Sequence, residues 1–198
     1  MSLLAIPENS QLLLIDPVPK YLGEFEDTLS EKIVQQFRLL SLAADAARVP
    51  RYFVVSSAGR RRDNWLSTPC EQNKPRVFAV EPGRAVWTNE QLLKAMRQEM
   101  RAQLFVCGFW LDDVVSATAL EALALGFNAH LITDLTPAMD RANQKPAIDR
   151  LNQYGVPPIS LRALLYEWAA NSNDAVTQKE LMLHWEAQKD IERRGASA

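Results

Sequence analysis

Short apolar runs alternate with amphipathic stretches along most of the chain, and this alternation is the strongest constraint on its fold. The apolar runs lie at 11–16, 51–57, 76–80, 104–108, 127–133 and 157–160. Between them, apolar residues recur at helical spacing over 29–49, 89–101, 113–125, part of 138–155 and 161–170. Strands that are apolar on both faces and separated by amphipathic helices are typical of a parallel sheet covered on both sides.

The connections between the strands set the handedness of the fold. Crossovers between parallel strands are right-handed by strong preference, so we expect a three-layer α/β/α, doubly wound, mainly parallel sheet of about six strands. Ligands of such sheets bind beyond the carboxyl ends of the strands. The residues expected at that edge are Asp16, Ser56, Ser57, Glu81, the turn 109–114, Thr133 and Asp134.

Two helix boundaries can be predicted from local signals. Ser30, followed by Glu31, suits the cap of the helix 29–49, because a serine oxygen satisfies a free N–H group of the first turn. In 138–155 we expect a helix interrupted near Pro146, because proline removes a backbone donor.

The composition excludes several classes of protein. The formal net charge of −2 argues against binding to nucleic acid or to an anionic membrane surface. No apolar run approaches the ~20 residues that a membrane-spanning helix needs. Two cysteines, Cys70 and Cys107, are too few for a disulfide framework. Since the opening "MSLLAIPENS" does not look like a signal peptide, we expect a cytoplasmic protein.

Three segments together resemble the isochorismatase-like hydrolases, a family that includes isochorismatases, nicotinamidases and N-carbamoyl amidohydrolases. They are "LLLIDPVPKYL", "VFAVEPGRAVWTNEQLLKAM" and "LFVCGFWLDDVVSATALEALALGFNAHLITDLTPA". The third is similar to the strand-to-helix elbow of the family, with Gly108, Asp112, Val115, Thr118, Ala119 and Gly126 in register. The resemblance covers residues 10 to 170 and implies the fold expected above.

The resemblance also implies a reaction that this chain has lost. Cysteine hydrolases of the family use an aspartate as base, a lysine as electrostatic partner and a cysteine as nucleophile. Asp16 matches the aspartate, whereas the lysine position holds Glu81 and the cysteine position holds Val114. A valine side chain has no lone pair with which to attack a carbonyl, so thioester chemistry at this elbow is excluded.

Other candidate catalytic groups have simpler interpretations. Cys107 lies in an apolar strand and is expected to be a buried, inert thiol, and nothing pairs Cys70 with a base. The Asp-x-His metal motif of nicotinamidase-like members has no counterpart in "SSAGRRRDNW", whose basic triplet is expected to face solvent. His130 is expected within a strand and His184 on the surface of the terminal helix, not at ligand spacing, so neither a metal nor a cofactor is expected.

Four further residues are candidates for substrate contacts. Arg84 either restores the positive charge of the missing lysine or faces solvent. Trp87, Trp110 and Leu111 either line a small apolar pocket or pack in the core. The resemblance also implies a cis peptide bond at Trp110–Leu111.

Three hypotheses for the function follow. The first is a family member without cysteine-hydrolase activity that binds a small molecule or a partner. The second is an active hydrolase of the isochorismatase kind, which cleaves a vinyl ether with Asp16 as general acid. The third is a structural or regulatory subunit of an oligomer, which associates with an active paralogue and whose pocket is closed by Trp110.

Residues 173–198 extend beyond the α/β domain of residues 1–172. Asp174 can cap a helix there, with Val176, Leu181, Trp185 and Gln188 close to one face. Such a face either packs on its own domain or is buried against another subunit. Because members of the family are commonly dimers or larger, we expect a homo-oligomer.

Overall fold

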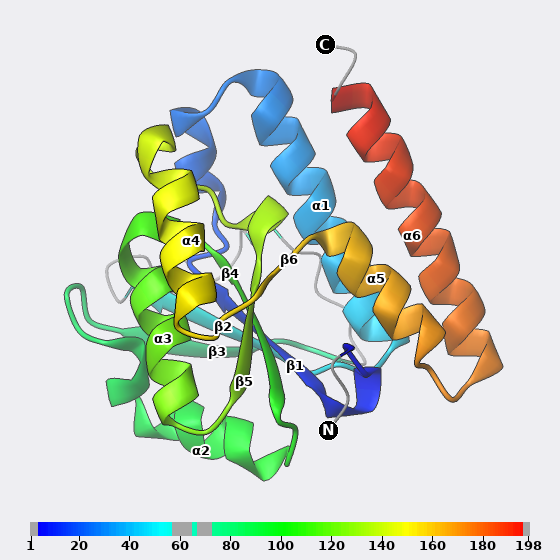
Figure 1. The fold of residues 1–198 in the computed structure, drawn as a ribbon, viewed down its shortest axis with the longest axis horizontal. Helices are drawn as coiled ribbons and strands as arrows, with labels where there is room; N and C mark the ends of the chain where they lie inside the picture. Colours follow the sequence, from blue (N-terminus) through cyan, green and yellow to red (C-terminus); the bar gives the residue numbers. More distant parts are fainter. Residues whose placement is uncertain (1–3, 57–64, 67–72, 196–198) are drawn as a thin grey trace.

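A six-stranded parallel sheet lies at the centre of the computed structural model, which describes residues 4–56, 65–66 and 73–195. The strands are β1 (Ser10–Ile15), β2 (Arg51–Ser56), β3 (Arg76–Val80), β4 (Gln103–Gly108), β5 (Asn128–Ile132) and β6 (Pro158–Ile159). Their order is β3-β2-β1-β4-β5-β6, and every neighbouring pair is parallel (Figure 1). The predicted doubly wound sheet is therefore confirmed, with its order reversing between β1 and β4.

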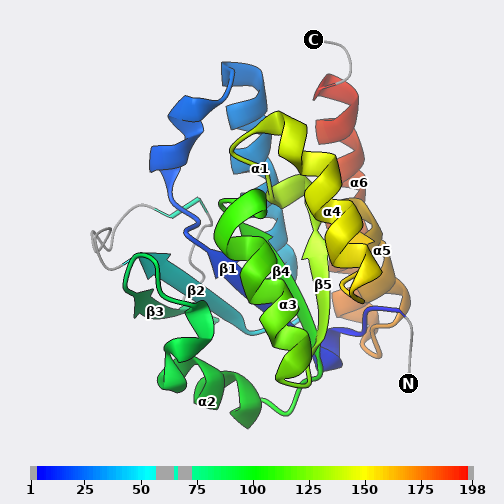
Figure 2. The same ribbon diagram turned by 60° about the vertical axis from the view of Figure 1, so that its left-hand side comes forward.

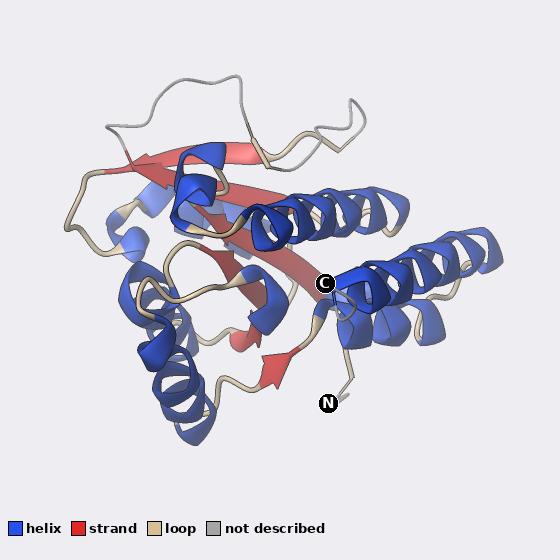
Figure 3. Cartoon of the chain, turned by 90° about the horizontal axis from the view of Figure 1, so that it is seen from above, coloured by secondary structure: helices blue, strands red, loops and turns tan. Residues whose placement is uncertain are grey.

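Helices cover both faces of the sheet, which produces the predicted three layers (Figures 2 and 3). They are α1 (Asp27–Ala46), α2 (Glu90–Gln98), α3 (Ser116–Ala124), α4 (Gln144–Gln153), α5 (Leu161–Ala170) and α6 (Ala175–Gly195). Alternate residues of β1 enter different cores, because successive strand side chains point to opposite faces. Leu12 and Leu14 pack with α1, α5 and α6, whereas Leu13 and Ile15 pack with α2, α3 and α4.

The first helix begins earlier than its capping signal predicts. The prediction that Ser30 caps it is wrong, because α1 begins at Asp27 and Glu26 occupies the cap position. The Ser30 hydroxyl instead donates to the carbonyl of Leu22, at a distance of 2.8 Å, and ties the helix to the turn before it.

The predicted interruption near Pro146 is also wrong. Helix α4 begins at Gln144, so Pro146 lies in its first turn. The N–H groups of a first turn have no partner within the helix, and a proline there costs no hydrogen bond. The preceding residues form a short helical turn, Arg141–Asn143, which the Asp140 carboxylate caps by accepting a 2.9 Å bond from the N–H of Ala142.

The terminal helix α6 packs along α1 and α5 of its own chain (Figure 1). The predicted cap is confirmed, since an Asp174 oxygen lies 2.8 Å from the Thr177 nitrogen. Leu181 is fully buried, but Val176 is 74% exposed and does not belong to the buried face as expected. His184 is half-buried and not a surface residue, because its Nε2 atom is enclosed where α6 packs.

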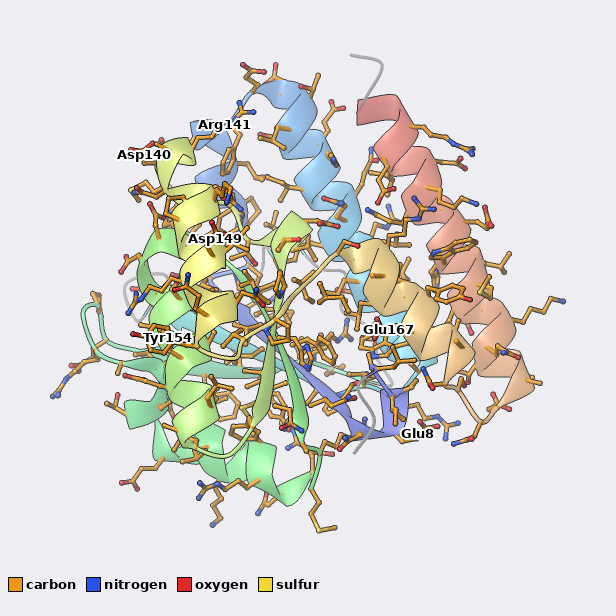
Figure 4. All side chains as sticks on the ribbon, viewed as in Figure 1. Glu8, Asp140, Arg141, Asp149, Tyr154 and Glu167 are labelled. Atoms are coloured by element: carbon orange, nitrogen blue, oxygen red, sulfur yellow. The ribbon has the colours of Figure 1, made fainter. Side chains whose placement is uncertain are left out.

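The amino-terminal segment is fastened to the same side of the molecule. The N–H group of Ala5 donates to the carboxylate of Glu167 on α5, at 2.7 Å, and Glu167 is labelled in Figure 4. None of the helices described in the structure combines the length and the apolar character that crossing a bilayer requires.

Candidate functional site

Asp16 stands immediately after β1, at the carboxyl edge of the sheet. Its backbone adopts a left-handed φ of 45°, and its N–H donates to the carbonyl of Val54 at 2.7 Å. Each carboxylate oxygen accepts one hydrogen bond: Oδ1 from the N–H of Ser56 at 2.9 Å, and Oδ2 from the hydroxyl of Tyr21 at 3.2 Å. The carboxylate is therefore fixed by two neighbouring elements and keeps lone pairs for a further donor.

A cavity of about 220 Å³ lies beside this carboxylate. It brings together Asp16, Glu81, Arg84 and Val114, the residues at the three positions of the triad and the candidate cation. The other residues that line it are Ile15, Tyr21, Val54, Val55, Ser56, Val80, Pro82, Gly83, Val86 and Asp113. The fold thus assembles the positions that the resemblance picked out, although only Asp16 keeps the residue of the triad.

Glu81 and Arg84 form the exposed wall of the cavity. Both residues belong to one turn after β3, in which the N–H of Arg84 donates to the carbonyl of Glu81 at 3.1 Å. They also border a more open hollow of about 460 Å³. Within the described part of the chain neither side chain forms an ion pair, so the charge of Arg84 is available to solvent and to the cavity alike.

The elbow brings Val114 to the opposite wall. The chain makes a wide helical turn at Leu111–Val115, and Asp113 departs from helical geometry with φ −131° and ψ −116°. This departure turns Asp113 and Val114 towards the cavity. The cis peptide bond joins Phe109 and Trp110, one residue earlier than the predicted Trp110–Leu111 bond, which is therefore wrong.

The three apolar candidates pack in the core and do not line the cavity. The indole N–H of Trp87 donates to the carbonyl of Thr118 at 2.9 Å, and its ring stacks on Phe127. Trp110 is 5% exposed and packs against Tyr21, Phe25 and Phe109. Leu111 is fully buried. These contacts account for the three side chains without a ligand.

The structure also shows two residues that the sequence reasoning missed. Tyr21 lines the cavity and donates to Asp16, and burial raises the pKa of its phenol. Lys20 Nζ lies 4.4 Å from the centre of the Tyr21 ring. A hydrogen bond to Tyr21 raises the pKa of Lys20, and its charge is attracted to Asp16. The helical turn Pro19–Glu24 brings these side chains close to Asp16. No pattern in the sequence predicts this contact.

Cys107 and the two histidines do not line the cavity. Cys107 is fully buried, as predicted, and burial raises the pKa of its thiol. His130 belongs to β5, as predicted, and stacks on Phe105. Cys70 and the basic triplet at 60–62 lie outside the described residues. Within the described ranges, no three His, Cys, Asp or Glu side chains gather in a way that would hold a metal ion.

Comparisons with known proteins point in one direction. A family model for the isochorismatase domain matches residues 10–163. The probable hydrolase YcaC of Escherichia coli K12 is 30% identical over 79 residues, which span 39% of this chain and only 38% of that relative.

Two solved structures share the fold. The YcaC gene product from Escherichia coli, described as an octameric hydrolase of unknown specificity, superimposes with a TM-score of 0.77 and 20% identity, covering 100% of this chain and 97% of the other. An isochorismatase from Pseudomonas putida KT2440 gives a TM-score of 0.68 and 17% identity, covering 83% and 94% of the two chains. These likenesses agree with the topology of the sheet.

Proposed function

This chain belongs to the isochorismatase family, and from that premise we propose that it binds a small molecule beside Asp16 without cysteine-dependent hydrolysis. One observation carries the proposal: Val114 faces the cavity where the cysteine of a family hydrolase would act. The buried thiol of Cys107 cannot replace it, because only an accessible thiolate is a good nucleophile.

The dimensions of the cavity restrict the ligand. At about 220 Å³ it is smaller than the roughly 300–1,000 Å³ of most ligand pockets, so the ligand has few heavy atoms. Asp16 accepts a hydrogen bond from an N–H or O–H group of the ligand, and Arg84 supplies positive charge in the wall of the cavity. An amide or alcohol of a few carbon atoms meets these requirements.

The experiment separates binding from turnover. Acetamide, propionamide and benzamide are titrated into the protein by ligand-observed NMR, and ammonia release is followed with and without a thiol alkylator. We expect binding without turnover, and we expect Asp16→Asn to weaken binding about tenfold, as loss of a hydrogen bond to a charged group does. Turnover that the alkylator abolishes and that disappears in Cys107→Ala would refute the proposal.

Acid catalysis by Asp16 is the second candidate function. It is supported by the retained aspartate, which lines the cavity, since cleavage of a vinyl ether needs a proton donor and no thiol. This activity would be insensitive to an alkylator and absent from Asp16→Asn. A purely structural role has less support, because Trp110 packs in the core and does not close the cavity.

We also propose that the protein self-associates. The octameric YcaC neighbour supports this proposal, and the outer face of α6 offers apolar surface for it, since Leu183 is 63% exposed and Val176 is 74% exposed. An octamer is a property of that neighbour alone, and the number of subunits proposed for this chain is simply more than one.

A further inference from the structure

A second cavity, of about 610 Å³, lies at the carboxyl edge of the sheet on the side of α1. It is enclosed by the beginning of α1, the turns that follow β5 and β6, and the segment before α4. It shares no lining residue with the cavity beside Asp16. Ligands of doubly wound sheets bind at this edge, so the position is suitable for a second site.

Gln36 is the polar group that this cavity leaves without a partner. The residue is 1% exposed, and no residue in the described ranges forms a hydrogen bond with its side-chain amide. Gln36 lines the cavity, so the little surface that it retains faces that space. A buried amide normally makes its hydrogen bonds, and leaving them unmade is costly. With so little surface, the amide can form no more than one hydrogen bond with a molecule bound in the cavity.

The charges around the cavity disfavour an anionic ligand. Four carboxylates line it, Glu24, Glu26, Asp134 and Glu192, against two cations, Lys32 and Arg141. Asp134 already accepts bonds from the N–H of Leu161 at 2.9 Å and the hydroxyl of Thr133 at 3.1 Å. Burial raises the pKa of Asp134, and the nearby Glu192 carboxylate raises it further, so an added negative charge would be repelled there.

Two exposed apolar side chains lie among the charged residues that line the cavity. Leu29 is 44% exposed and Met139 is 69% exposed, and both line the opening. Arg141, labelled in Figure 4, also lines the cavity and belongs to the segment before α4. A ligand whose polar head reaches Gln36 therefore extends an apolar portion towards Leu29 and Met139, where removing it from water is favourable.

We propose that this cavity binds a small neutral molecule that has a primary amide head and a short apolar tail, the amide pairing with Gln36. A primary amide carries both donors and an acceptor, so it can pair with either the oxygen or the nitrogen of the glutamine amide. The proposal is independent of the function proposed for the Asp16 cavity.

Three probes with the same tail test the head group: pentanamide, pentanoate and pentylammonium. Each is titrated into ¹⁵N-labelled protein, and the amide signals of α1 and of residues 133–144 are followed by NMR. We expect pentanamide to bind most tightly and pentanoate least. Equal affinity for the three probes, tighter binding of pentylammonium than of pentanamide, or shifts confined to residues around Asp16 would overturn the proposal.

A matched pair of variants tests the residue. Gln36→Met keeps the length of the side chain and removes its polar atoms, whereas Gln35→Met makes the same change at the exposed neighbouring position. We expect Gln36→Met to weaken pentanamide binding about five- to tenfold, the effect of one lost hydrogen bond, and to raise the melting temperature. Gln35→Met should change neither. A lower melting temperature with unchanged binding would mean that Gln36 is only structural.

Discussion

Gly108 sits where β1 and β4 approach each other, directly beside the residue that precedes Asp16. Its φ is +124°, and a Cβ atom placed there would lie 2.0 Å from the carbonyl oxygen of Ile15. Gly108→Ala therefore must push the two strands apart, and we expect it to destabilise the fold by roughly 3–5 kcal/mol. Gly23→Ala is the control, since its Cβ meets no atom within 4 Å. Chemical denaturation measures both, and an unchanged midpoint for Gly108→Ala would contradict the close approach.

At the same scale, the sequence predicted which residues lie at the carboxyl edge of the sheet. It did not predict whether a given aromatic side chain lines the cavity or packs in the core. Asp16 and Val114 were located because the end of a parallel strand and an elbow define fixed positions at one edge. The positions of Trp87 and Trp110 could not be decided from the sequence, because an aromatic residue is equally suited to the wall of a pocket and to a hydrophobic core. The contact of Lys20 and Tyr21 with Asp16 depends on a six-residue helical turn, whose path no periodicity predicts.

At the scale of elements, α6 contains an imidazole whose ionisation opposes packing. Burial lowers the pKa of His184, while Glu180 opposes the shift, and the Nε2 atom has no partner within the described structure. The folded state thus binds this proton less readily than the unfolded chain, whose histidine pKa is about 6.5. The stability that this histidine contributes is fully present above about pH 6.5 and is lost as the pH falls through the lower pKa of the folded state.

Replacement of this histidine tests that sign. We expect His184→Leu to reduce the loss of stability between about pH 6.5 and pH 5, because leucine cannot take up a proton and leaves no unpartnered nitrogen. Urea denaturation at several pH values measures the slope, and the NMR titration of the His184 ring gives its pKa directly. A ring that titrates above the value of an unfolded histidine, or an unchanged slope, would show that the imidazole is not enclosed.

The sequence predicted the buried face of each helix better than the residues at which the helix begins. The stripe of Ile33, Phe37 and Leu40 identified α1, because burial of one face requires that spacing. The first residue of α1 was predicted wrongly because the Ser30 hydroxyl donates to the carbonyl of Leu22 and does not cap the helix. This contact depends on the path of the preceding turn, which local sequence preferences do not predict. The predicted interruption at Pro146 was wrong for a similar reason: proline breaks the interior of a helix, but Pro146 lies in the first turn of α4, where proline is favourable.

At the scale of the whole molecule, α6 has two faces with different expected roles. Leu181 is fully buried in the core shared with α1 and α5, so Leu181→Ala should cost about 2–5 kcal/mol of folding free energy. Leu183, on the outer face, is 63% exposed, and Leu183→Glu should change stability by less than about 0.5 kcal/mol. Removal of all residues after Asn171 takes away Leu181 and exposes the core residues of α1 and α5 that pack against α6. This truncation should therefore destabilise the domain whether or not the protein forms an oligomer.

The surface variant therefore decides how the molecule assembles. If copies of the chain associate through the outer face of α6, Leu183→Glu places a charge in that interface, and a buried, unpaired charge is strongly unfavourable. We expect sedimentation velocity to show a smaller species for Leu183→Glu than for the unaltered protein, at an unchanged melting temperature. Val77→Glu is the control, because Val77 on the edge strand β3 is also exposed and lies away from α6. If Leu183→Glu keeps the assembly size of the unaltered protein, α6 serves only to brace its own domain.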